Sequence, residues 1–248
     1  MSGHSKWANI QHRKGRQDAK KAKFFTKAAK DIILAAKAGG GNPDDNATLR
    51  LAIQKAKAVN LPKDRIENAI KKGTGELAGG DLAEILYEGY GPGGVALLVE
   101  VATDNKNRTV AEIRHAFTKH GGNMAESGAV SYMFNRKGVI VFNKDKYTED
   151  DLMEVGLEAG AEDIIDDGDT FVVHTAPAEF MAVQQAFADA DMEYESAEFN
   201  QVPETMIPVD ATVGKKVMNL FDALDDNDDT QNVYMNADLP DDLFDEED

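Results

Sequence analysis

The first third of the chain has apolar residues at helical spacing. One series predicts a helix from about residue 18 to residue 38, ended by glycines at 39–41: Phe25, Ala28, Ala29, Ile32, Ala35 and Ala36. A second helix follows Asn42-Pro43-Asp44-Asp45, and a third begins at Pro62 and ends at Gly73. Three short helices with short connections predict a small bundle.

Beyond a glycine-rich connection at residues 73–81, the pattern changes to alternating strands and helices. One group predicts a strand, a helix and a strand at 95–101, 109–120 and 129–134, with Thr109 and Glu112 at capping-box spacing. The next group predicts a strand, a helix, two strands, a helix and a strand at 138–142, 148–159, 163–165, 170–175, 178–190 and 194–200. This β-α-β-β-α-β order is that of a ferredoxin-like unit.

The closing stretch predicts a helix at about 214–224 and a strand at 231–236. With residues 95–134 they complete a second α/β domain, which the ferredoxin-like unit interrupts. The predicted fold class is therefore α+β, with an N-terminal three-helix domain and two α/β (ferredoxin-like) domains, one inserted in the other. The predicted boundaries are 1–76 for the helical domain, 82–134 plus 205–240 for the discontinuous domain, 135–204 for the inserted domain and 241–248 for an acidic tail.

Charge divides the chain in two. The 248 residues carry a formal net charge of -18, yet residues 1–72 hold 17 lysines and arginines against six acidic residues. Residues 73–248 hold the remaining ten against 39. This distribution indicates an acidic body with one polyanion-binding module. The alternative is that the basic segment docks on the acidic part of its own chain, because charge segregation alone does not say which acid it meets.

Basic residues gather in the first thirty positions, where nine lysines and arginines stand against Asp18 alone. Four lysines follow one face of the predicted first helix, a spacing that suits a phosphate backbone: Lys20, Lys23, Lys27 and Lys30. Trp7, the single tryptophan, stands among cations, which suits base stacking with phosphate neutralisation on unpaired RNA. The alternative is that Trp7 anchors the N-terminal segment on the helical bundle. A helix-turn-helix is a further interpretation of the three helices, but no base-reading residues identify a recognition helix.

Composition and motifs exclude several classes of protein. The absence of cysteine excludes disulfides, thiolate nucleophiles and zinc ribbons, and it favours a reducing, cytoplasmic location. No apolar run approaches the roughly 20 residues of a membrane-spanning helix, so no membrane partner is expected. Residues 89–94 match G-x-G-x-x-G, but they precede a strand where a dinucleotide site requires a helix, so they predict a tight turn. The acidic run at 225–229 does not fit a calcium-binding loop and predicts a solvated loop. The acidic tail at 241–248 is expected to compete with nucleic acid for the basic segment.

Histidines and carboxylates give no catalytic constellation. His115 and His120 are five residues apart, on different faces of one predicted helix, and His174 stands alone in a strand. No cofactor, metal or small-molecule substrate is therefore expected, and no enzyme is predicted. Two other classes stay open, namely a protein-interaction module that uses the acidic surface and a hydrolase whose cleft only a structure would reveal.

Several long motifs resemble the YebC/PmpR family. They are GHSKWANI at 3–10, HRK at 12–14, DAKK at 18–21, YEGYGPGG at 87–94, NRTVAEIR at 107–114, GGN at 121–123, KGVI at 137–140, EAGAED at 158–163 and VYMN at 233–236. On these motifs the chain is identified as a member of that family. The resemblance implies a helical N-terminal domain and two α/β domains, the last inserted into the middle one.

The resemblance also implies a role in gene expression. Members are commonly named probable DNA-binding transcriptional regulators, whereas related bacterial and mitochondrial members resemble translational activators that act on ribosomes, including at proline-rich stalls. The expected partner is therefore ribosomal RNA or promoter DNA, and the oligomeric state is not indicated. A basic arm on an acidic body suits insertion into ribosomal RNA, whereas duplex recognition calls for a dimer with a reading helix.

The expected nucleic-acid contacts fall into two groups. The family motif carries over to His4, Lys6, Trp7, His12, Arg13 and Lys14 as a binding arm, and to Lys106, Arg108 and Arg114 as a second contact. The charge pattern adds Arg16, Lys20, Lys21, Lys23, Lys27 and Lys30 to the arm.

Overall fold

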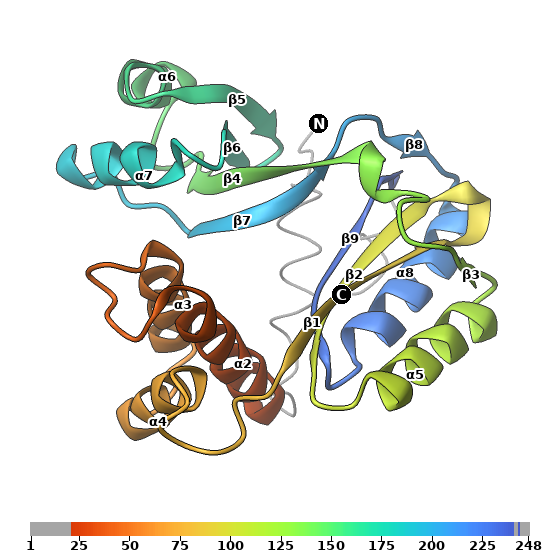
Figure 1. Cartoon of the computed structure of the whole chain (residues 1–248). Helices are drawn as coiled ribbons and strands as arrows, with labels where there is room; N and C mark the ends of the chain where they lie inside the picture. Colours follow the sequence, from red (N-terminus) through yellow and green to blue (C-terminus); the bar gives the residue numbers. More distant parts are fainter. Residues whose placement is uncertain (1–20, 241–242, 244–248) are drawn as a thin grey trace. The chain divides into compact units, whose positions relative to one another are not determined.

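The structure, a computed structural model, describes residues 21–240 and Leu243 (Figure 1). The described residues form two compact units, one made of 21–131 with 212–237 and the other of 132–211 with 238–240 and Leu243. Helices and antiparallel sheets combine in an α+β fold, with a helical N-terminal region followed by α/β segments. The predicted fold class is confirmed, while the boundaries of the three predicted domains stay a prediction.

Three helices form the N-terminal region, as predicted. They are α2 (Lys21–Gly39), α3 (Ala47–Ala58) and α4 (Lys63–Gly73). Ile32, Leu49 and Ala56 are completely buried in their shared core, so the apolar spacing identified the inward faces. The buried Asn46 caps α3, because its side chain accepts from the Leu49 amide at 3.0 Å, and it also donates to the Ala35 carbonyl of α2 at 2.8 Å.

The same unit contains a four-stranded antiparallel sheet in the order β3-β1-β2-β9. Its strands and helices are β1 (Ala83–Tyr90), β2 (Ala96–Thr103), α5 (Lys106–Lys119), β3 (Asn123–Met124), α8 (Ala211–Asp225) and β9 (Thr230–Met235). A short 3-10 turn, η2 (Pro92–Gly94), connects β1 to β2. Val233 of β9 pairs with Val99 of β2, so the end of the chain completes a sheet that begins before the insertion.

Two predictions for this unit are wrong. The N-cap of α5 is Asn105, and Thr109 lies one turn inside the helix with its side chain buried, because its hydroxyl is used in a polar network described below. Residues 129–133 form no strand, since η3 (Ser131–Met133) is a 3-10 turn. The amides of Val130 and Ser131 donate to the carboxylate of Glu88 and are therefore unavailable to a neighbouring strand.

The second unit is ferredoxin-like, as predicted. Its elements are β4 (Phe134–Asn143), α6 (Glu149–Glu158), β5 (Ala161–Asp167), β6 (Thr170–Thr175), α7 (Phe180–Asp189) and β7 (Ser196–Pro203). The sheet is antiparallel in the order β5-β6-β4-β7. Phe142, Phe180 and Phe187 are completely buried in its core, where Gly138 lets β4 approach the Phe180 ring, since a Cβ there would lie 2.2 Å from it. Two short strands, β8 (Ile207–Pro208) and β10 (Ala237–Asp238), pair with each other.

Candidate nucleic-acid interface

Much of the predicted arm lies outside the described residues: His4, Lys6, Trp7, His12, Arg13, Lys14, Arg16 and Lys20. The acidic tail at 241–248 lies outside them too, apart from Leu243. The roles assigned to these residues stay predictions. Lys21 is the first residue of α2, and Lys23, Lys27 and Lys30 follow on the same helix. The last three, which we name the lysine ridge, have described surroundings.

The lysine ridge meets the segment at the end of α8 and before β9, residues 225–229, which we name the acidic loop. Lys23 Nζ donates to the Asp225 carbonyl and lies 3.2 Å from Asp226 Oδ1. Lys27 Nζ lies 2.9 Å from Asp225 Oδ1 and 3.3 Å from the Asp225 carbonyl oxygen. These ammonium groups therefore bind both carboxylates and the C-terminal end of α8, where the helix dipole is negative. The lysine ridge thus contacts acidic residues of its own chain, which is the alternative to nucleic-acid binding that the charge distribution left open.

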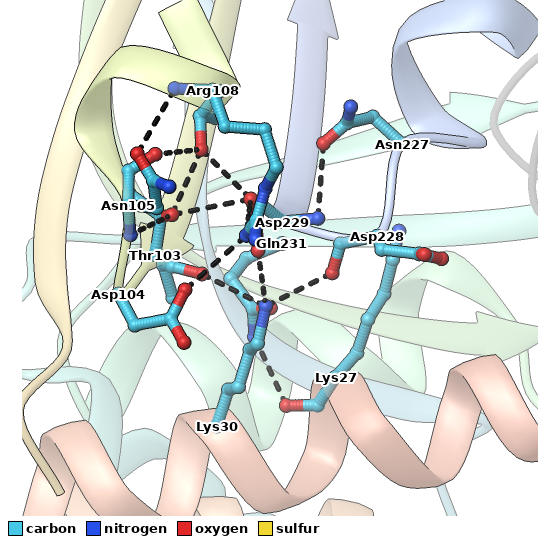
Figure 2. A network of polar contacts seen from close by, with 12 residues as sticks. Lys27, Lys30, Thr103, Asp104, Asn105, Arg108, Asn227, Asp228, Asp229 and Gln231 are labelled. Atoms are coloured by element: carbon cyan, nitrogen blue, oxygen red, sulfur yellow. Dashed lines mark hydrogen bonds and ion pairs between the residues drawn. The ribbon is translucent and has the colours of Figure 1, made fainter. Parts of the chain in front are cut away.

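Lys30 is held by three acceptors (Figure 2). Its Nζ donates to the Ala102 carbonyl at 2.9 Å, to the Asp228 carbonyl at 3.0 Å and to Asp229 Oδ1 at 2.9 Å. An ammonium group has three protons, so all of them are used here. Lys30 is therefore a structural residue in this arrangement, and its predicted contact with nucleic acid would require these bonds to break.

Asp229 is the centre of the network in Figure 2. Its side chain is 7% exposed, and its Oδ2 lies 2.7 Å from Arg108 Nη2, 2.7 Å from Thr109 Oγ1 and 3.1 Å from Thr103 Oγ1. Burial opposes ionisation, but the hydrogen bonds from Arg108, Lys30 and Thr109 outweigh it and hold the pKa of Asp229 well below its usual range. The prediction of a solvated loop is wrong at this residue, because the buried carboxylate joins β2, α5 and α2.

The second predicted group of contacts lies on α5 and divides in two. The guanidinium of Arg108 binds Asp229 and lies 3.2 Å from Asp104 Oδ1, and the hydrogen bond with Asp229 raises its pKa. Lys106 and Arg114 are exposed and form no ion pair with any other described residue. Arg108 is therefore engaged within the fold and the other two are accessible, while contact of the group with nucleic acid stays a prediction.

Further accessible cations lie on α3 and α4. Lys57, Arg65 and Lys71 are exposed and make no ion pair within the described part of the chain. The exposed surface of α4 also carries Asp64 and Glu67. The helix α4 therefore presents exposed charges of both signs to solvent.

The glycines of residues 89–94 serve the sheet. β1 continues as far as Tyr90, and the Gly91 amide donates to the Val95 carbonyl at 2.8 Å to close the turn. Gly89 allows close packing, because a Cβ there would lie 2.6 Å from the Phe117 ring. The motif precedes β2 and only a three-residue 3-10 turn begins in it, so the phosphate-binding helix terminus of a dinucleotide site is missing from it.

Glu88 precedes these glycines and is buried, with 3% of its surface exposed. Its Oε1 accepts from the Gly128 amide at 2.7 Å, and its Oε2 accepts from the Val130 and Ser131 amides, each at 2.8 Å. Burial opposes ionisation, but the hydrogen bonds from the three amides and from the Ser131 side chain outweigh it and lower the pKa of Glu88. This carboxylate therefore fixes the segment that leads from the first unit to the second. The sequence pattern did not identify it, because a buried glutamate in a strand resembles a solvated one.

One pocket bears on the hydrolase interpretation. This pocket lies in the ferredoxin-like unit and is lined by Asn143, Lys146, Glu193, Tyr194 and Glu195. Lys146 and Glu193 lie 2.8 Å apart, and their hydrogen bond raises the pKa of the lysine and lowers that of the glutamate. Both groups are held in their charged forms, which is the reverse of the tuning that a general acid or base needs near neutral pH.

Two other features are missing from the part of the chain that the structure describes. It holds no cluster of three or more histidine, aspartate or glutamate side chains suited to a metal ion. Among the described helices there is also no candidate for a membrane span.

Comparison with known proteins connects this fold to a family. Residues 5–76 match the model of the TACO1/YebC protein N-terminal domain, and residues 82–237 match that of the TACO1/YebC second and third domain. A probable transcriptional regulatory protein of Maridesulfovibrio salexigens is 64% identical over 244 residues, 98% of either chain. Another, of Solidesulfovibrio magneticus, is 60% identical over 98% of this chain and all of its own. The crystal structure of a conserved hypothetical protein from Aquifex aeolicus has a TM-score of 0.83 and 42% identity, and the match covers 90% of this chain and 92% of that one.

Proposed function

Because the chain belongs to the TACO1/YebC family, we propose that it is a non-enzymatic, nucleic-acid-binding regulator of gene expression. In this proposal it acts in the cytoplasm, and its basic N-terminal arm contacts ribosomal RNA to support translation, including at proline-rich stalls. No cofactor, metal, membrane or small-molecule substrate takes part. The names of the relatives support a regulatory role, and the resemblance to translational activators supports the ribosome as the place of action.

The observation that carries the proposal is how the lysine ridge binds oxygen. Lys23 and Lys27 lie toward the N-terminal end of α2, and the ammonium group of each lies within 3.3 Å of two or more oxygen atoms. Phosphate oxygens accept the same charge-assisted hydrogen bonds as carboxylate oxygens. A helix side that binds several anionic and carbonyl oxygens is therefore suited to successive phosphates, and α2 begins at Lys21, directly after most of the arm in the sequence.

The distribution of charge favours ribosomal RNA over free duplex. Residues 132–211 hold four lysines and arginines against 19 acidic residues, so nucleic acid repels this unit. A basic segment carried by so acidic a body suits insertion between RNA elements, where only the arm must enter. Reading a duplex in the helix-turn-helix manner requires a recognition helix in a groove, and no base-reading residues identify one in the N-terminal helical region.

A DNA-binding transcriptional regulator is the second candidate function. The names of the relatives favour it, since they are called probable transcriptional regulatory proteins. Such a protein would select duplex fragments of particular sequence and bind RNA only weakly. A protein-interaction module, by contrast, would keep its partner when the basic arm is neutralised.

Binding through the arm predicts a defined salt dependence. Replacing Lys6, Arg13 and Lys14 with alanine removes three candidate partners of phosphate groups. The slope of log affinity against log salt for a single-stranded RNA of about 30 nucleotides should become shallower by about 0.7 for each phosphate that is no longer neutralised. Fluorescence anisotropy of labelled RNA between low and physiological salt measures this slope.

The matched control replaces Lys144, Lys146 and Lys216 with alanine, which removes the same charge from outside the arm. It should leave the slope unchanged. Equal slopes for the wild type and the arm variant would contradict the arm as the site of binding. A duplex DNA of about 30 base pairs, measured in parallel, separates the two candidate functions.

A further inference from the structure

The ion pairs of the lysine ridge differ in their exposure to solvent. The Asp229 side chain that pairs with Lys30 is 7% exposed, the Asp225 side chain that pairs with Lys27 is 15% exposed, and the Asp226 side chain that pairs with Lys23 is 51% exposed. Exposure therefore increases toward the N-terminal end of α2, where the arm continues. The acidic loop is buried at one end of the ridge and open to solvent at the other.

The buried end is held by several hydrogen bonds. Asp229 is held by Arg108 and Thr109 as well as by Lys30, and removing one partner from a buried ion pair leaves an uncompensated charge. Gln231 of β9 adds a bond to the helix itself, because its Nε2 donates to the Lys27 carbonyl at 3.0 Å. A competitor for the ridge would therefore leave Lys30 in place.

The open end of the loop is more exposed to water. The Lys23 ammonium shares the Asp225 carbonyl with Lys27, and its carboxylate partner, Asp226, is half exposed. Ion pairs in contact with water contribute little to stability, because solvent screens them and both side chains lose freedom. The Lys23–Asp226 pair can therefore open at low cost, whereas the Lys27–Asp225 pair, whose side chains are 14% and 15% exposed, costs more to open.

We propose that the acidic loop is a built-in competitor of nucleic acid: a phosphate backbone bound by the arm displaces Asp225 and Asp226 from Lys27 and Lys23, while the Lys30–Asp229 pair stays closed. This inference rests on the proposed function and adds regulation of the same site. A single phosphate would not replace two carboxylates and a carbonyl, whereas a continuous strand brings successive phosphates along the helix. The loop therefore favours long polyanions over short ones and weakens nonspecific binding.

The test is to neutralise the open end of the loop. The double variant Asp225→Asn with Asp226→Asn should bind a single-stranded RNA of about 30 nucleotides about fivefold more tightly at low salt, because two partly exposed ion pairs no longer compete. Adding Lys23→Ala and Lys27→Ala to this variant should abolish the gain, while the same two lysine changes in the wild type should have a smaller effect. Duplex DNA of about 30 base pairs is measured in parallel to show whether the gain in affinity is larger for RNA or for DNA.

The control is a pair with the same change of net charge elsewhere, Glu154→Gln with Glu158→Gln on the exposed side of α6. It should raise affinity less than about twofold, because it acts only through long-range, screened repulsion. Equal gains in the control and loop variants would overturn the competitor and leave the proposed function intact. If the wild type bound neither RNA nor DNA, or bound them with an affinity that did not depend on salt, both the competitor loop and the proposed function would be overturned.

Hydrogen exchange provides a second measurement that needs no substitution. The amide of Asp226 donates to the Asp222 carbonyl at 2.8 Å, and the amide of Asp229 donates to Asn227 Oδ1 at 2.9 Å. Displacement of the loop should speed exchange at Asp226 when RNA is bound, while Asp229 remains protected. Unchanged or slower exchange at Asp226 in the RNA complex would contradict displacement.

Discussion

Asp229→Asn is expected to lower the free energy of unfolding by about 3 kcal/mol, the low end of the cost of breaking a buried ion pair. The substitution keeps the shape of the side chain but removes the charge that Lys30 and Arg108 share. The expected cost lies at the low end of that range because the Arg108 side chain is 46% exposed, so water solvates part of it when its partner loses the charge. Urea denaturation followed by circular dichroism measures the loss.

Asp228→Asn is the matched control for this prediction. Asp228 is the neighbouring residue, its side chain is exposed, and it contributes only its carbonyl oxygen to Lys30. Its replacement should change stability by no more than about 0.5 kcal/mol. Equal decreases in the two variants would show that general loop charge, and not the buried carboxylate, stabilises the unit.

The same carboxylate gives a pH dependence of definite sign. The pKa of Asp229 is lower in the folded chain than in the unfolded chain, so its stabilising contribution is complete above the ordinary aspartate pKa. That contribution is lost as the pH falls through the folded value. The stability difference between wild type and Asp229→Asn should therefore be constant near neutral pH and should shrink progressively as the pH falls below the ordinary aspartate pKa.

Glu88→Gln should lower the free energy of unfolding by about 2 to 3 kcal/mol, since hydrogen bonds to a charged group contribute more than neutral ones. The amide oxygen can still accept from Val130 and Ser131, but the new NH₂ group then faces the donating amide of Gly128. One bond is lost, a buried donor is left unsatisfied and the charge disappears. Thermal unfolding monitored by circular dichroism measures the effect.

Glu84→Gln is the control on the same strand, because Glu84 lies in β1 and is exposed. It should change stability by less than about 0.5 kcal/mol. The pKa of Glu88 is lowered in the folded state, so the difference between wild type and Glu88→Gln should diminish as the pH falls below the ordinary glutamate pKa. A Glu88→Gln variant as stable as the Glu84→Gln control would contradict the anchoring role of the carboxylate.

Helices and most strands could be predicted because the local spacing of apolar residues indicates which face of each element is buried. Ile32 and Leu49 have no exposure, as their helical series predicted, and Phe142 lies in the core of a predicted strand. β1 was missed for a physical reason as well. It ends in Glu88, Gly89 and Tyr90, and the buried acid and the glycine break the alternation that identifies a half-buried strand.

The polar network could not be predicted, because its partners are distant in sequence. Four of the five residues at 225–229 are aspartates, and no local pattern tells which one is buried. Asp229 is buried because the fold brings Lys30, Arg108 and Thr109 to it from distant segments of the chain. The sequence did predict that Lys23, Lys27 and Lys30 share one face of a helix. It left open whether that face meets nucleic acid or the acidic part of the chain.

The most direct test of the central claim is sedimentation of a cell lysate through a sucrose gradient at physiological salt, with and without ribonuclease. The wild type should travel with ribosomal particles in the untreated lysate and leave them after digestion. Replacement of Lys6, Arg13 and Lys14 by alanine should release it to the top of the gradient, whereas replacement of Lys144, Lys146 and Lys216 should not. Wild-type protein that stays at the top, while the purified chain selects duplex DNA fragments, would contradict action on the ribosome and establish the transcriptional alternative.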